Sequence, residues 1–244
     1  MSTPHKTIVV TGGSTGIGLC ICLSLLDAGY KVINLSRRKA EIDRESFSNM
    51  QVDLSSRDET SEAAEKIAAK HEVTGFVHNA GLIRPALLGD VQLNDFDYLA
   101  QVHIGTAISL TQAFLPKMKK NNFGRIVLIT SRAALGLQTR TSYATTKSGM
   151  MGMARTWALE LGEFGITVNT VAPGPIEATE MFHEVMPEGD PKIDSLAASI
   201  PVKRVGRPDD VARAVLFFND PENSFVTGQT LMVCGGASLG SLSL

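Results

Sequence analysis

The chain has 244 residues, of which 43% are hydrophobic and 20% are charged, and its formal net charge at pH 7 is −2. This composition is typical of a globular α/β protein, and it excludes disordered chains, collagen and small disulfide scaffolds. A net charge so close to zero gives no electrostatic reason to expect nucleic acid or an anionic membrane as a partner. We therefore expect neither of these partners.

Cysteine and histidine usage favours a protein without disulfides or metal. Cys20, Cys22 and Cys234 are too few and too poorly spaced for a disulfide framework or a zinc knuckle. The five histidines show no ligand spacing with cysteine or carboxylate, so no metal site is predicted. The first residues lead into a strand pattern instead of a basic and then apolar leader, and no stretch reaches about 18 uninterrupted apolar residues. These features predict a cytoplasmic protein.

Short β-branched runs alternate with amphipathic stretches along the chain, which is the pattern of a parallel sheet with helices on both faces. No repeat or linker interrupts it, so we expect one α/β domain over residues 1–244. In chain order we predict a strand at 7–10, a helix at 17–28, strands at 31–35 and 50–52, a helix at 57–71, a strand at 74–77, a helix at 96–120, a strand at 124–130, a helix at 142–161, a strand at 166–171, a helix at 209–218 and a strand at 230–233.

The stretch from 177 to 201 has no clear periodicity and contains the helix breakers Pro187, Gly189 and Pro191. Compact domains usually keep such a long unpatterned segment for a function, such as a lid over an active site. We therefore predict that residues 177–201 form a substrate-binding lid. Four of its side chains are expected to line an apolar substrate pocket: Met181, Phe182, His183 and Met186.

A glycine-rich turn, TGGSTGIG at residues 11–18, joins the first predicted strand to the first predicted helix. Amides at a helix N-terminus and the positive end of its dipole attract anions, and glycines let the backbone approach them closely. The spacing Gly-x3-Gly-x-Gly differs from the commoner dinucleotide fingerprint, and alone it fits a tight turn equally well. The strand before it and the helix after it favour a dinucleotide phosphate site.

A second group of residues indicates general acid and base catalysis. Tyr143 and Lys147 lie four residues apart in a predicted helix, so their side chains share one face. A nearby cation lowers a tyrosine pKa from about 10, which makes the phenol a useful general acid and base. Ser131, just after a predicted strand, can place its hydroxyl beside the same carbonyl oxygen. By itself the tyrosine and lysine spacing also occurs by chance on exposed helices, whereas its combination with the glycine turn favours catalysis.

The residues after the second predicted strand select the nicotinamide cofactor. An acidic side chain there would accept hydrogen bonds from the ribose hydroxyls of NAD, whereas a cation would bind the 2′-phosphate of NADP. Ser36 occupies the place of the acid, and Arg37, Arg38 and Lys39 follow it. We therefore predict NADP(H), bound through Ser36 and Arg37 with Arg38 as a second cation. The alternative is a solvated basic turn.

Together with these features, several ordered motifs resemble the short-chain dehydrogenase/reductases over nearly the whole chain. The resemblance implies a doubly wound, Rossmann-like parallel sheet and self-association as a homodimer or homotetramer. The motifs are TGGSTGIG at 11–18, the pair Asp53-Leu54, HNAG at 78–81, Ser131 with YATTK at 143–147, VNTVAPGPI at 168–176, GRPDDVA at 206–212 and TGQTLMVCGG at 227–236.

The resemblance also implies residue roles. Tyr143 would exchange the proton with the substrate, Lys147 would bind the nicotinamide ribose and lower the tyrosine pKa, and Ser131 would polarise the substrate oxygen. Asp53 would bond the adenine. The full set of implied cofactor contacts is Gly12, Ser14, Thr15, Gly16, Ile17, Gly18, Ser36, Arg37, Arg38, Asp53, Leu54, Asn79, Ala80, Gly81, Tyr143, Lys147, Pro173, Gly174, Ile176 and Thr179.

In four places the sequence departs from the family pattern. His103 stands where the family usually has an Asn that anchors a proton-relay water, so it is either a catalytic relay group or a packed helix histidine. The serine-to-tyrosine interval is one residue short, which leaves Thr130 as an alternative hydroxyl. An extra residue precedes Thr179, and Cys234 replaces an Asp that is mostly structural.

These residues predict an NADP(H)-dependent oxidoreductase that interconverts a ketone and a secondary alcohol by hydride transfer. An alternative within the same chemistry is a reductase of 3-oxoacyl thioesters on a carrier protein or coenzyme A. Arg132, Arg140, Lys203 and Arg204 would then meet an acidic carrier, or they form a solvated surface. A rival of another class is a non-catalytic module that senses nucleotides.

Overall fold

The computed structural model describes residues 6–184 and 186–239, so residues 1–5, 185 and 240–244 of the predicted domain lie outside the described residues. At its centre is a seven-stranded sheet in the order β3-β2-β1-β4-β5-β6-β7, with every neighbouring pair parallel. This confirms the predicted parallel sheet. Its strands are β1 (Thr7–Thr11), β2 (Lys31–Ser36), β3 (Phe47–Gln51), β4 (Val73–His78), β5 (Gly124–Ile129), β6 (Ile166–Pro173) and β7 (Thr230–Val233).

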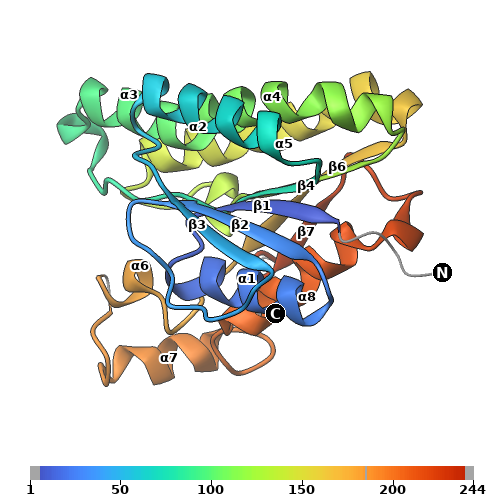
Figure 1. Ribbon diagram of the computed structural model, residues 1–244. Coiled ribbons are helices and arrows are strands. Elements are labelled where there is room, and N and C mark those ends of the chain that lie inside the picture. The colour runs from blue at the N-terminus through green and yellow to red at the C-terminus, as the bar shows by residue number, and fades with distance from the viewer. Residues whose placement is uncertain (1–5, 185, 240–244) are drawn as a thin grey trace.

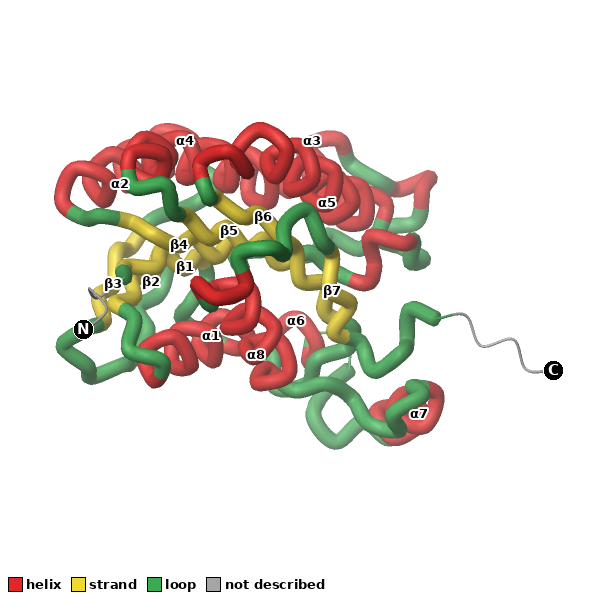
Figure 2. Tube along the Cα trace, turned by 90° about the vertical axis from the view of Figure 1, so that its right-hand side faces the viewer, coloured by secondary structure: helices red, strands yellow, loops and turns green. Residues whose placement is uncertain are grey.

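Two layers of helices enclose the sheet (Figure 1), and Figure 2 shows the strands between them. One layer holds α2, α4 and α5, and the other holds α1 and α8. The helices are α1 (Gly16–Asp27), α2 (Arg57–Lys70), α3 (Leu93–Ala100), α4 (Thr106–Lys120), α5 (Thr141–Leu161), α6 (Glu180–His183), α7 (Lys192–Ser199) and α8 (Pro208–Asn219).

The strand sequences account for this sandwich. Successive side chains of a strand point to opposite faces, so in β1 Val9 packs beneath α2, α4 and α5, whereas Ile8 and Val10 pack against α1 and α8. All six residues of β5 are buried, as expected for a central parallel strand covered on both faces. Residues on both faces of the inner strands are therefore buried, and most of them are apolar.

The carboxyl ends of β1 and β4 mark the point where the strand order reverses, which is where open α/β sheets bind ligands. The Thr11 hydroxyl oxygen accepts hydrogen bonds from the amides of Asn79 and Ala80, both at 3.0 Å. The loops that follow the two strands are thereby joined across the crevice.

The predicted helix over 96–120 forms as one unbroken helical run over 93–120, and only its internal hydrogen-bonding pattern differs from the expectation. The run consists of α3, a π-helical turn at Gln101–Gly105 and then α4, and the amide of Thr106 donates to the Gln101 carbonyl five residues back. A π turn inserts one residue without breaking the helical run, so apolar periodicity does not reveal it. The turn directs Val102 and His103 into the protein, where both are buried.

The segment 177–201 is more ordered than its sequence indicates, since it contains α6 and α7. Ile193 and Leu196 of α7 pack against a small cluster around Phe182, Ile200 and Val205, separate from the main core. In Figure 1 these two helices lie together beside the main sandwich. Within the described ranges, no helix combines the length and apolar character needed to cross a bilayer.

Candidate active site

A cavity of about 610 Å³ opens at the carboxyl ends of the strands. Every residue predicted to contact the cofactor lines it, and so does Ser131. His103 and His183 do not line it, so the prediction that His183 faces the substrate is wrong. The His183 Nδ1 instead lies 3.3 Å from the Met186 carbonyl oxygen. The cavity thus unites the glycine turn and the tyrosine-lysine pair, which are more than 120 residues apart.

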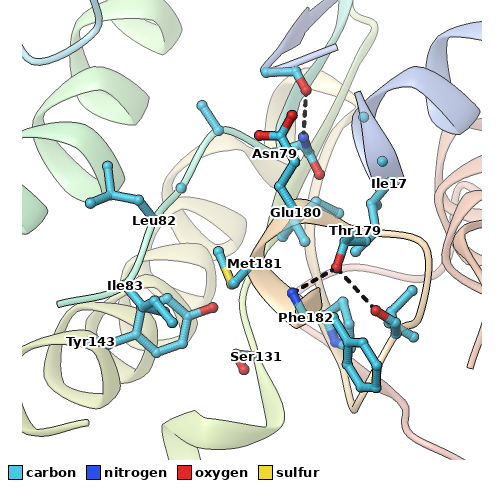
Figure 3. A pocket seen from close by; sticks show the side chains of 18 of the residues that line it. Ile17, Asn79, Leu82, Ile83, Ser131, Tyr143, Thr179, Glu180, Met181 and Phe182 are labelled. Carbon is cyan, nitrogen blue, oxygen red and sulfur yellow. Dashed lines mark hydrogen bonds between the residues drawn. The ribbon is translucent and has the colours of Figure 1, made fainter. Parts of the chain in front are cut away.

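Close packing against Gly18 and hydrogen bonds from Asn79 fix the conformation of the glycine turn. Gly12 has a φ of 68°, and a Cβ on Gly18 would collide with the Gly12 carbonyl oxygen. The Asn79 amide donates to the carbonyls of Thr11 and Gly12 at 3.2 and 3.1 Å (Figure 3). Thr15 does not cap α1 with its side chain, and the first turn of α1 carries no acidic residue. The helix N-terminus is therefore open to an anion.

The predicted cations, Arg37 and Arg38, lie in the turn that follows β2. The Ser36 hydroxyl donates to the Arg38 carbonyl at 2.6 Å and accepts from the Asn34 amide at 2.9 Å, so it shapes the turn that carries the arginines. Arg38 forms an ion pair with Glu180 of α6 at 2.8 Å. No sequence pattern indicates this pair, because its residues are 142 positions apart and α6 has only four residues.

Asp53 begins the loop between β3 and α2. Its carboxylate accepts hydrogen bonds from the Ser55 amide at 2.9 Å and the Ser55 hydroxyl at 2.8 Å. These bonds, with the nearby charge of Arg37, hold the pKa of Asp53 below its usual range. The carboxylate is thus a fixed acceptor in the cavity wall.

Tyr143 and Lys147 are one turn apart on α5, and the Lys147 ammonium lies 5.7 Å from the centre of the Tyr143 ring. Figure 3 shows the Tyr143 hydroxyl pointing into the cavity, towards Ser131 and Met181. The Lys147 amine donates to the Ile129 carbonyl at 2.8 Å. The Lys147 amine is thus held at the end of β5, and both side chains line the same cavity.

Burial dominates the titration of both groups. It raises the pKa of Tyr143, whereas a hydrogen bond with Ser131 and the charge of Arg140 lower it. Burial also lowers the pKa of Lys147 to about 7. The cation whose charge lowers the Tyr143 pKa here is Arg140, a role that the sequence reasoning gave to Lys147.

Ser131 retains its predicted place despite the shortened interval. Its oxygen accepts from the Ala133 amide at 3.1 Å, which begins a short 3-10 turn at Arg132–Leu135. The hydroxyl of Thr130, the alternative, donates to the Val171 carbonyl of β6 at 3.1 Å. Ser131 is therefore the hydroxyl that faces Tyr143.

His103 lies behind the cavity wall, fully buried by the π turn. Its Nε2 accepts from the Leu82 amide at 3.3 Å, so its Nδ1 carries the proton and donates to the Thr146 hydroxyl at 2.8 Å. Its ring meets the Tyr143 ring edge-on, with centroids 5.6 Å apart. Burial, reinforced by the charge of Lys147, lowers the pKa of His103 well below its usual value. A neutral histidine thus ties the loop after β4 to α5.

Thr179 caps α6. Its hydroxyl donates to the Ile176 carbonyl at 3.0 Å and accepts from the Phe182 amide at 3.2 Å (Figure 3). Beyond it the cavity becomes apolar, with Met181, Phe182 and Met186 in the wall as predicted. Lys203 and Arg204 lie outside it. Further lining residues, among them Leu82, Ile83 and Tyr98, carried no signal in the sequence.

Comparisons with known proteins identify the family of this chain. A family model described as enoyl-(acyl carrier protein) reductase matches residues 12–238. The (2S)-[(R)-hydroxy(phenyl)methyl]succinyl-CoA dehydrogenase subunit BbsD of Thauera aromatica is 36% identical over 98% of this chain and 99% of its own. The 3-oxoacyl-[acyl-carrier-protein] reductase FabG of Thermotoga maritima is 34% identical over 97% and 99%.

A solved structure extends the likeness to three dimensions. The structure of ElxO with NADP bound is 30% identical, covers 95% of this chain and 98% of its own, and has a TM-score of 0.87. Since the family model and these relatives span almost the entire sequence, the chain belongs to the short-chain dehydrogenase/reductases, oxidoreductases that act on CH–OH and C=O groups.

Proposed function

We propose that this chain is an NADP(H)-dependent oxidoreductase that interconverts a ketone and a secondary alcohol, with Tyr143 as general acid and base. The observation that supports it is the convergence of Ser131, Tyr143 and Lys147 on one cavity with the glycine turn. A phenol and an amine buried together are typical of an active site, because burial shifts both pKa values away from those in water.

The residues present fit NADP(H). The uncapped N-terminus of α1 suits a pyrophosphate, and Arg37 and Arg38 suit a 2′-phosphate. When bound, the cofactor supplies the hydride. We propose Asp53 as the adenine contact, Asn79 and Gly81 at the adenine ribose and the back of the cofactor, and Lys147 at the nicotinamide ribose. The nicotinamide side would be held by Pro173, Gly174, Ile176 and Thr179.

In the reductive direction the Tyr143 hydroxyl gives its proton to the substrate oxygen, and the Ser131 hydroxyl donates a hydrogen bond to the same oxygen. The phenolate left behind is stabilised by the charge of Arg140, which lowers the pKa of Tyr143. His103 acts through its contacts alone, by holding Leu82 and α5 in register. The oxidative direction uses the same groups in reverse.

Residues 177–201 would cover the substrate, since Met181, Phe182, Met186 and Leu196 line the cavity from this segment. A second candidate substrate class is the 3-oxoacyl thioester on coenzyme A or acyl carrier protein, which the names of the relatives favour. Self-association as a homodimer or homotetramer and a cytoplasmic location stay predictions from the sequence.

The test is NADPH oxidation by the purified protein with a panel of simple ketones and acetoacetyl-CoA. Tyr143→Phe should lower kcat by about 10²- to 10⁴-fold while NADPH still binds, as followed by its fluorescence. Tyr98→Phe is the matched control, because Tyr98 lines the same cavity away from Lys147. A wild-type protein that binds NADPH tightly but reduces no substrate would refute the proposal that the protein is an oxidoreductase and would favour a nucleotide sensor.

A further inference from the structure

Two arginines stand in the cavity wall beside the proposed catalytic residues. Arg140 directly precedes α5, three residues before Tyr143, and Arg132 directly follows Ser131; both are half-buried and line the cavity. Within the described part of the chain neither of them forms an ion pair. Among the described residues the Arg140 side chain donates only to its neighbour Thr139, and the Arg132 side chain donates to the Ala237 carbonyl at 3.4 Å.

The position of Arg140 is unfavourable for the helix that follows. The N-terminus of α5, a helix of 21 residues, is the positive end of its dipole, where a cation is repelled. No side chain caps this end, and its first turn holds no acidic residue. Helix stability therefore does not explain an arginine here, whereas an anion bound beside it would satisfy both the side chain and the dipole.

The backbone holds Arg140 in place from both sides. Thr139 has a φ of 64°, a left-handed conformation that side chains other than glycine rarely adopt. Its carbonyl accepts from the Ala86 amide at 3.0 Å, and the Arg140 carbonyl accepts from the Ala144 amide at 2.6 Å. Strain that the surroundings maintain in this way is typical of a functional position.

Arg140 shares the cavity with the reacting groups, since it lies three residues before Tyr143 and both line the wall, and its charge lowers the pKa of the Tyr143 phenol. Apolar side chains of Ile83, Leu137 and Met181 share the cavity wall. An anion held by Arg140 would thus lie near the carbonyl that Tyr143 and Ser131 reach. The fork of a guanidinium matches a carboxylate in two parallel hydrogen bonds.

We propose that Arg140, assisted by Arg132, forms an anion subsite inside the cavity, and that the substrate is an oxo acid with a free carboxylate close to its reactive carbonyl. This inference rests on the proposed function, because it names the substrate class of the same site. It differs from recognition of an acidic carrier, which would bind outside the cavity.

The experiment compares 2-oxopentanoate and 4-oxopentanoate with their methyl esters, which keep the carbonyl and remove the charge. With NADPH-loaded wild-type protein, kcat/KM for at least one acid should exceed that for its ester by about tenfold or more. Arg140→Gln removes a charge that also acts on Tyr143 and should lower kcat/KM for acid and ester alike, but it should abolish the preference, so the value for the acid falls by about tenfold more than that for its ester. Arg84→Gln is the matched control, because Arg84 pairs with Asp95 at 3.3 Å and lies outside the cavity wall.

Titration calorimetry of the same acids and esters separates this inference from the proposed function. If no ketone is reduced, the proposed function fails, while tighter binding of an acid than of its ester, lost in Arg140→Gln, still supports the subsite. Equal dissociation constants for acid and ester in the wild type would overturn the anion subsite. An equal loss of affinity for acid and ester in Arg140→Gln would overturn it as well. Should Arg140→Gln lower the melting temperature, Arg140→Lys serves instead, and it must keep part of the preference for the acid.

Discussion

The Arg38 guanidinium lies 2.8 Å from the Glu180 carboxylate, so the turn after β2 is joined to the segment that covers the substrate end of the cavity. The same guanidinium is 3.4 Å from the Thr15 hydroxyl in the glycine turn. The two side chains are 61% and 58% exposed, and such a pair is weak because water and salt screen it. A phosphate at this place would compete with Glu180 for Arg38.

Removing the competing charge should strengthen NADPH binding. In Glu180→Gln the KM for NADPH should fall by about two- to fivefold, with that for NADH unchanged, because only NADPH carries the 2′-phosphate. Steady-state kinetics with both cofactors measures this. Glu184→Gln is the control, since Glu184 lines the same cavity and forms no ion pair among the described residues. An unchanged or higher KM for NADPH would contradict the competition.

Cofactor choice should depend on Arg37. Arg37→Ala should raise the KM for NADPH by about tenfold, because a charge-assisted bond to phosphate is lost, and it should change the KM for NADH by less than about twofold. Lys39→Ala, which removes an exposed cation outside the cavity wall, should have little effect on either. An equal rise for both cofactors, or a wild-type preference for NADH, would refute the assignment of NADP(H).

Burial of Lys147 predicts how stability varies with pH. The folded protein binds the lysine proton with a pKa of about 7, below the ordinary value of 10.5, so between these values the unfolded chain holds more protons. Stability therefore rises with pH in this range, by about 1 kcal/mol from pH 7 to pH 8. Urea unfolding of wild type and Lys147→Met at pH 6 to 9 checks it. The free energy of unfolding of the wild type minus that of Lys147→Met should rise with pH. A constant difference would show that Lys147 does not titrate as proposed.

His103 should act by position and not by proton transfer. His103→Leu removes the acceptor of the half-buried Leu82 amide and the donor to the buried Thr146 hydroxyl, so the free energy of unfolding should fall by about 2 kcal/mol. His103→Asn keeps a donor and an acceptor and should restore part of this loss. The pH profile of kcat in His103→Asn should keep the wild-type shape. A shifted profile would instead identify His103 as a relay group.

The site could be predicted from the sequence because its residues lie at the carboxyl ends of the parallel strands. The carboxyl ends of parallel strands meet at one edge of the sheet, so the residues after β1, β2, β4, β5 and β6 were expected together before their distances were known. Local patterns could not place His103, because one inserted residue in the π turn decides which way it points. They also could not pair Arg38 with Glu180, whose contact depends on how a four-residue helix folds back.

The bonds that Thr11 and Asn79 make across the crevice leave the two sides of the sheet no hinge between them. We therefore expect any opening and closing of the cavity to come from the segment 177–201, whose α6 and α7 pack on their own small cluster apart from the main core. A spin label or fluorophore on α7 would report that motion, while one beside β1 would stay still.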